Sequence, residues 1–290
     1  MIETKAVSIR RQKRKKRRSR LRLGILIFLA LLLLLTAGFA RQLCPFDPNA
    51  QIFDPLLPPD PGHLCGTDRY GRDLFSRILI GLRTSVFSTL ALVAIITITG
   101  TALGVACGFL GGFAGSLIMR ISDICLAFPG LVFALAIAAL LNGGLQNAVL
   151  SLAVISWPRY ARIARSQTLA VRQTDYIKAA LLAGDTGVQI IFRHILPNIL
   201  GPILVTATLD IGTMMMELAG LSFLGLGAQP PTAELGNMMS GGRSMLQIYP
   251  WVVLSPGLAI LTAVVIFNLL GDGLRDYLDP RNSFKSPSIL

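Results

Sequence analysis

An apolar run at residues 201–223 carries polar side chains at helical spacing. Asp210 lies near the centre of this run, where a charge is costly in lipid unless it faces water or protein. One helical face would present Thr206, Asp210, Met214 and Glu217. These side chains are interpreted either as a polar stripe lining a path across the membrane or as groups that hydrogen-bond neighbouring helices. The sequence leaves both interpretations open.

Motifs for nucleotide or metal chemistry are missing from the sequence. It contains neither the phosphate-binding pattern G-x-x-x-x-G-K-[ST] nor the zinc pattern H-E-x-x-H. Met214–Met216 could contact a soft metal, but methionine in an apolar helix usually packs, so no metal site is assigned. We therefore expect a chain that is not itself an enzyme and that holds no cofactor of its own.

A short amphipathic segment, KAALLAGDTGVQIIFRHILPN at residues 178–198, interrupts the apolar runs. A helix over 166–183 is predicted to stop at Gly184. Thr186 and Gln189 have capping-box spacing, which predicts a second helix that Pro197 should end. His194 is expected to be structural. The two helices would form a knob at 170–198 that a groove of a soluble partner could enclose.

The composition indicates a membrane protein. Hydrophobic residues make up 53% of the 290 residues and charged residues 14%, whereas soluble domains carry about 25% charged residues. The net charge of +12 is concentrated, because eleven Lys and Arg lie within residues 1–22, directly before the apolar run 23–40. This placement favours a cytoplasmic tail near anionic lipid and argues against a nucleic-acid partner.

The apolar runs predict an all-α integral membrane protein with six transmembrane helices. Excess Lys and Arg over 159–198 place that segment in the cytoplasm, together with the N-terminal tail 1–22 and the C-terminal tail 273–290. Residues 41–83 and 224–249 are then extracytoplasmic. The predicted spans are 23–40, 84–110, 123–141, 145–157, 199–223 and 250–271.

The outer loop 41–83 is rich in proline and contains two cysteines. From Asp73 onward its apolar residues recur at helical spacing, which predicts an interfacial helix along the outer membrane surface. Cys44 and Cys65 bracket the proline-rich part. They could form a disulfide in an oxidising compartment or remain free, since sequence spacing does not fix their distance.

The amphipathic segment also resembles a known motif. Lys178-Ala179-Ala180, Gly184 and His194-Ile195-Leu196-Pro197 resemble the EAA loop of type I ATP-binding-cassette importer permeases. The stretches 66–85, 221–238 and 267–280 are similar to the C-type permeases of the dipeptide, oligopeptide and nickel import family. The resemblance therefore extends, in order, over most of residues 41–280.

This resemblance implies a permease subunit in the bacterial cytoplasmic (inner) membrane, with its type I transmembrane domain over 84–272. It implies a heterodimer with a homologous second permease, two subunits that bind ATP and Mg, and an extracytoplasmic substrate-binding protein. Lys178 replaces the family's glutamate, so either Asp175 takes its role or the partner's charge is reversed. The implied ATPase-coupling residues are Asp175, Lys178, Ala179, Ala180, Gly184 and Asp185.

The substrate is the open part of the sequence interpretation. The 209–227 region is closer to the nickel members of the family, so nickel or a nickel chelate is expected, with dipeptides or oligopeptides as the alternative. An ion-driven secondary transporter is a remote alternative because Asp210 and Glu217 lie in a span. Such transporters usually contain internal repeats, and the sequence has none.

Overall fold

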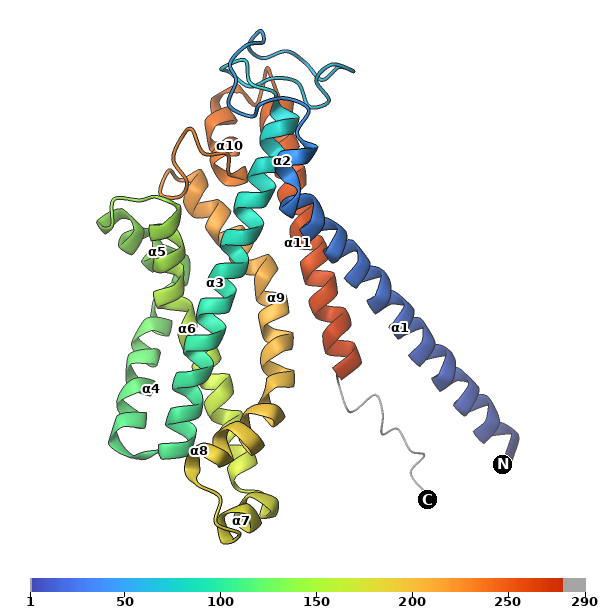
Figure 1. Ribbon diagram of the computed structural model, residues 1–290, viewed down its shortest axis with the longest axis vertical. Helices are drawn as coiled ribbons and strands as arrows, with labels where there is room; N and C mark the ends of the chain where they lie inside the picture. The colour runs from blue at the N-terminus through green and yellow to red at the C-terminus, as the bar shows by residue number, and fades with distance from the viewer. Residues whose placement is uncertain (1, 279–290) are drawn as a thin grey trace.

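A computed structural model of the chain describes residues 2–278, and the side chains of these except residues 2–19 and Ala114. Within these residues the fold is helical, without a named strand, as predicted (Figure 1). The helices are α1 (Ile2–Gly38), α2 (Ala40–Leu43), α3 (Leu74–Leu110), α4 (Gly112–Ala127), α5 (Gly130–Leu140), α6 (Leu145–Arg172), α7 (Asp175–Leu182), α8 (Gly187–Gln189), a π-helix (Ile190–Ile195), α9 (Leu196–Phe223), α10 (Leu235–Gly242), a 3₁₀ turn (Arg243–Met245) and α11 (Trp251–Leu278).

Helices cover all six predicted spans, but not every one is long and apolar enough, as a straight helix, to cross a membrane. In the described chain, four segments are long and apolar enough to cross a membrane: 20–38, 74–110, 187–223 and 251–278. The predicted span 123–141 is instead bent by 95° between α4 and α5, where Pro129 precedes α5. The helix α6 covers the predicted span 145–157 and has 28 residues. Its arginines lower its hydropathy, so it is not among these four segments.

The two ends of the bundle differ in what they carry (Figure 1). The knob predicted at 170–198, called the coupling segment below, includes α7 and lies at the lower end, as does the start of α1. The loop between α2 and α3 lies at the upper end with α10. The helix α11 reaches Leu278, so the first six residues of the predicted tail 273–290 are helical, and residues 279–290 lie outside the described chain.

The predicted interfacial helix is wrong, because residues 74–83 are the first turns of α3. Asp73 caps this helix, its Oδ2 accepting a hydrogen bond of 2.8 Å from the backbone N–H of Ser76. Leu74 and Ile78 then pack in a buried cluster with residues of α1, α9 and α11. Leu74 and Ile78 of the apolar stripe are thus covered by other helices.

Three glycines join α3 to α6. Gly100, Gly104 and Gly108 recur every four residues and face α6. A Cβ at Gly104 would lie 2.3 Å from the carbonyl oxygen of Ala161, and one at Gly108 would lie 2.8 Å from Cβ of Thr168. Helices in lipid associate closely where such small residues let the backbones approach. This packing positions α6 and its arginines against the rest of the bundle.

Candidate coupling and translocation sites

The predicted helix stop and capping box of the coupling segment are both confirmed, but the helix predicted over 166–183 is divided into the end of α6, at Arg172, and α7. Gly184 follows α7 with a φ of 93°, a backbone conformation that residues with a side chain rarely adopt. Thr186 and Gln189 form the reciprocal capping box at the start of α8. The two helices therefore meet at a glycine turn.

Buried isoleucines and polar bonds hold the coupling segment together. Ile177 and Ile190 are fully buried at its base. Nε2 of His194 lies 3.0 Å from Oδ2 of Asp185, which ties the turn to the π-helix. Asn198 donates to the carbonyl oxygen of His194. These contacts match the structural role expected for His194, since its imidazole joins the π-helix to the turn that contains Asp185.

The outer surface of the coupling segment is apolar. Leu182 is 91% exposed and Phe192 68% exposed. Ala179, which precedes both in the sequence, is exposed, and Ala180 is half-buried. Burial of exposed leucine and phenylalanine is favourable by about 1.5–3 kcal/mol for each side chain. This surface can therefore bind a protein groove.

Lys178 pairs with a neighbour in its own helix. Its Nζ lies 2.9 Å from Oδ1 of Asp175, and both side chains are solvent-exposed. Exposed pairs of this kind contribute little to stability, about 0.2–1 kcal/mol. Where the resembling family has a glutamate, this chain presents a lysine whose charge is balanced by Asp175.

Pro197 does not end the second helix, contrary to the sequence prediction. The chain passes from α8 through the π-helix Ile190–Ile195 into α9, and Pro197 lies in the first turn of α9. Proline is tolerated there because the N–H it lacks has no partner within its own helix at that position. The segment 187–223 is consequently one continuous helical span.

Asp210 of α9 forms an ion pair with Arg159 of α6. The Nη1 of Arg159 lies 2.7 Å from Oδ1 of Asp210. The Asp210 side chain is 3% exposed, and that of Arg159 is 56% exposed. Both residues lie near the middle of their helices. The structure thus gives Asp210 an interhelical partner.

The other residues of the predicted stripe differ in their surroundings. Thr206 donates to the carbonyl oxygen of Pro202 in its own helix, and Met214 is buried. Glu217 is half-buried and within electrostatic reach of Asp210 and Arg159. Among the described residues no group of three His, Cys, Asp or Glu side chains could hold a metal ion. Within the stripe, the buried Asp210 is thus paired with an exposed arginine of α6, and Glu217 lies nearby.

Cys44 and Cys65 are free thiols in the structure, so the disulfide considered from the sequence is not formed. The Sγ of Cys44 donates to the carbonyl oxygen of Ala40 at 3.1 Å, whereas Cys65 contacts Ser255 of α11. Burial raises the pKa of both thiols above the usual value, and Asp73 raises it further.

Sequence reasoning missed the partners of these residues. It assigned Arg159 to the cytoplasmic flank because the apolar run 145–157 ends before it. In the structure, α6 continues as a helix well past that run. It also missed Glu234, which is fully buried and accepts hydrogen bonds from Ser85 of α3 and from backbone N–H groups of α10. The glycine spacing at 100, 104 and 108 was a readable signal for packing.

Comparisons with known proteins agree with this architecture. Residues 100–284 match the family described as binding-protein-dependent transport system inner membrane component. The chain is 47% identical over 244 residues to a probable D,D-dipeptide transport system permease of Escherichia coli K12, covering 84% of this chain and 82% of that protein. It is 43% identical over 249 residues to a dipeptide transport system permease of Haemophilus influenzae, covering 83% and 84%.

A glutathione transport system permease of Pectobacterium atrosepticum is 44% identical over 247 residues, covering 84% of this chain and 82% of that protein. Among solved structures, the inward-facing MetNI methionine ABC transporter superposes with a TM-score of 0.51 at 22% identity. It covers 67% of this chain and 95% of the matched chain, and supports the fold. The chain therefore belongs to the family of binding-protein-dependent transport system inner membrane components, the permeases of ABC importers.

Proposed function

We propose that this chain is the permease subunit of an ATP-driven importer of short peptides and forms half of its translocation path. The observation that carries the proposal is the identity of 43–47% to dipeptide permeases along more than four fifths of this chain. These relatives favour the peptide alternative over the nickel expected from the sequence. The absence of a three-ligand metal cluster among the described residues gives nickel no support either.

The coupling segment 170–198 is the proposed docking site for an ATPase subunit. Its exposed apolar side chains, above all Leu182 and Phe192, offer a surface for a groove. The partner groove would meet the Asp175–Lys178 ion pair in place of a lone glutamate. ATP and Mg would be bound by the ATPase subunits, and Asp185 would act through its bond to His194.

The remaining partners follow from the same proposal. A homologous second permease would complete the path as a heterodimer, and an extracytoplasmic binding protein would deliver the peptide. The N-terminus, the coupling segment and the C-terminus would face the cytoplasm in the inner membrane. The exposure of Arg159 supports this proposal, because an arginine that is more than half exposed at mid-span would be costly against lipid. We therefore expect protein or water beside its side chain.

Uptake in cells that lack only this subunit tests the substrate. We expect plasmid-borne parental protein to restore uptake of a radiolabelled dipeptide and to leave uptake of radioactive nickel at the level of the deletion strain. Restoration of nickel uptake without dipeptide uptake would overturn the peptide assignment.

Gly184→Val tests the coupling segment. A Cβ at Gly184 would meet no atom within 4 Å, so the harm must come from the positive φ, at about 1–2 kcal/mol or more for a β-branched residue. We expect normal membrane insertion, with peptide uptake and peptide-stimulated ATP hydrolysis both reduced. Gly184→Asn is the matched control, because asparagine tolerates positive φ better. Parental uptake by Gly184→Val would contradict the assignment.

A further inference from the structure

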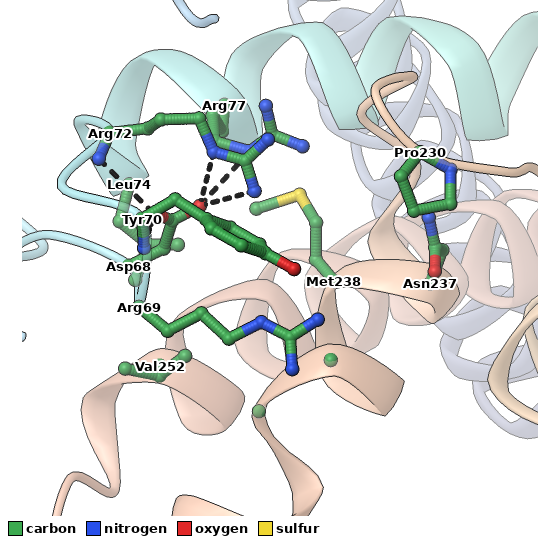
Figure 2. Close-up of a pocket in the computed structure, with 12 residues that line it drawn as sticks. Asp68, Arg69, Tyr70, Arg72, Leu74, Arg77, Pro230, Asn237, Met238 and Val252 are labelled. Atoms are coloured by element: carbon green, nitrogen blue, oxygen red, sulfur yellow. Dashed lines mark hydrogen bonds and ion pairs between the residues drawn. The ribbon is translucent and has the colours of Figure 1, made fainter. Parts of the chain in front are cut away.

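A small pocket opens at the end of the molecule opposite the coupling segment. Its volume is about 60 Å³, and it lies between the turn before α3, the helix α10 and the start of α11 (Figure 2). Arg69, Tyr70 and Arg72 form one side, and Asn237 and Met238 of α10 form the other. The function proposed above assigns no residue of this pocket a role.

The pocket carries unbalanced positive charge. Asp68 is paired with Arg72, whose Nε lies 2.6 Å from its Oδ2, and it lies 3.7 Å from Nε of Arg77 (Figure 2). Arg77 is buried and also donates to the carbonyl oxygen of Pro48. Within the described chain no carboxylate pairs with Arg69, which is exposed. Arg72 and Arg77 thus share the carboxylate of Asp68, and Arg69 adds a third guanidinium group to the pocket lining.

Tyr70 orients the free arginine. The guanidinium carbons of Arg69 and Arg72 each lie 4.7 Å from the centre of its ring. Such cation–π contacts contribute about 0.5–1 kcal/mol at exposed sites and limit the rotation of the side chain. A guanidinium held in this way presents a planar pair of donors, the geometry that a carboxylate accepts.

We propose that this pocket binds an Asp or Glu side chain of the extracytoplasmic substrate-binding protein, an inference that rests on the proposed function. The site is more than a surface charge, because Asn237 and Met238 of α10 line it together with Arg69. Tyrosine and arginine are also the residues that most often dominate the affinity of protein interfaces.

The position of the pocket favours a soluble partner over a lipid phosphate. The 37 residues of α3 span about 55 Å, whereas a bilayer with its headgroups is about 40–45 Å thick. Leu74, the first residue of α3, lines the pocket. The pocket therefore lies at the tip of a helix that is longer than the bilayer, together with the loop that precedes it.

The wall formed by α10 is anchored to two spans. Oε1 of Glu234 accepts a hydrogen bond of 2.8 Å from Ser85 of α3. Gly236 lies so close to α9 that a Cβ there would be 2.4 Å from the carbonyl oxygen of Ala219. A partner bound in the pocket would consequently contact an element that is packed against α3 and α9.

The test uses the whole transporter in nanodiscs and the binding protein loaded with a dipeptide. We expect Arg69→Gln to raise the Kd for the binding protein about tenfold in 150 mM NaCl, because a charge-assisted bond is lost. The Kd of Arg69→Lys should lie between those of the parental protein and Arg69→Gln, since lysine keeps the charge but lacks the paired donors of the guanidinium group. Arg41→Gln removes an exposed charge of α2, which does not line the pocket, and should leave the Kd unchanged.

Salt provides the second readout. The parental Kd should rise with NaCl concentration more steeply than that of Arg69→Gln, because the lost contact is the screened one. An equal Kd for parental protein and Arg69→Gln, or an equal loss in Arg41→Gln, would overturn the proposal. The proposal would also be overturned if Arg69→Gln impaired only the uptake of peptides with a free carboxylate and not the uptake of their amides. That result would indicate that the pocket binds the substrate. These affinities do not depend on peptide import, so failure of the proposed function would appear separately, as absent uptake by the parental transporter.

Discussion

Replacing Arg159 by leucine should harm assembly more than replacing Asp210 by leucine. The Asp210 side chain is 3% exposed, so without Arg159 its carboxylate would remain unpaired near mid-span. That costs about 2.5–3.5 kcal/mol on insertion scales. Arg159 is 56% exposed and long, so without Asp210 it can turn toward water, and the loss is nearer 1.5 kcal/mol.

The assay is the fraction of assembled transporter after detergent extraction, measured by fluorescence-detected size exclusion, together with the temperature at which half of the assembled peak is lost. A difference of 1.4 kcal/mol corresponds to a tenfold change in an equilibrium. Arg159→Leu should therefore assemble distinctly worse than Asp210→Leu. Asp210→Asn keeps an acceptor oxygen for Arg159 and should assemble and transport at nearly the parental level.

The double variant Arg159→Leu/Asp210→Leu separates this ion pair from unrelated damage. It removes both charges of the pair, so it should assemble better than Arg159→Leu alone, with a coupling that a double-mutant cycle measures. No recovery in the double variant would refute the interhelical role of the pair. If all leucine variants assemble fully and fail to transport, Asp210 lines the path, as the alternative interpretation holds.

Three further predictions concern packing, topology and the thiols. Gly104→Leu should abolish assembly because its Cβ would lie 2.3 Å from a carbonyl oxygen of α6, whereas Gly220→Ala, with open space around it, should assemble normally; equal assembly of both would contradict the glycine contact. In a background with the four cysteines replaced, an impermeant maleimide should label a cysteine placed at Asn49 and miss one placed at Gln173, and the reverse pattern would refute the orientation. Non-reducing mass spectrometry should find Cys44 and Cys65 as free thiols, with alkylation of Cys44 accelerating only as the pH rises through its raised pKa; a cross-linked peptide would contradict this.

Local signals in the sequence were sufficient for the local structure. The Thr186–Gln189 capping box and the turn at Gly184 depend on side-chain and backbone geometry within a few residues, and both are confirmed. The apolar runs likewise predicted the spans, since crossing a bilayer requires length and hydropathy. Each of these features is determined by residues close together in the chain.

Features that depend on distant partners were not predicted. The end of α6 was missed because Arg159 reads as a cytoplasmic charge until Asp210 of α9 is placed beside it. The stripe that begins α3 looked interfacial because the helices that cover it come from other parts of the chain. Pro197 was misread for a related reason, since the π-helix Ile190–Ile195, which has no evident sequence signature, joins α8 to α9 and leaves Pro197 in the first turn of α9.

The continuity of the segment 187–223 connects these sites physically. Its 37 residues extend about 55 Å from the capping box to the region of α10, with Asp210 in between. A helix transmits axial displacement because each turn is hydrogen-bonded to the next. The π-helix at 190–195 is the irregular turn in this element, and it lies directly beside the His194–Asp185 contact. A displacement of the coupling segment therefore has a helical route to the ion pair with Arg159 and, through Ala219 and Gly236, to the wall of the outer pocket.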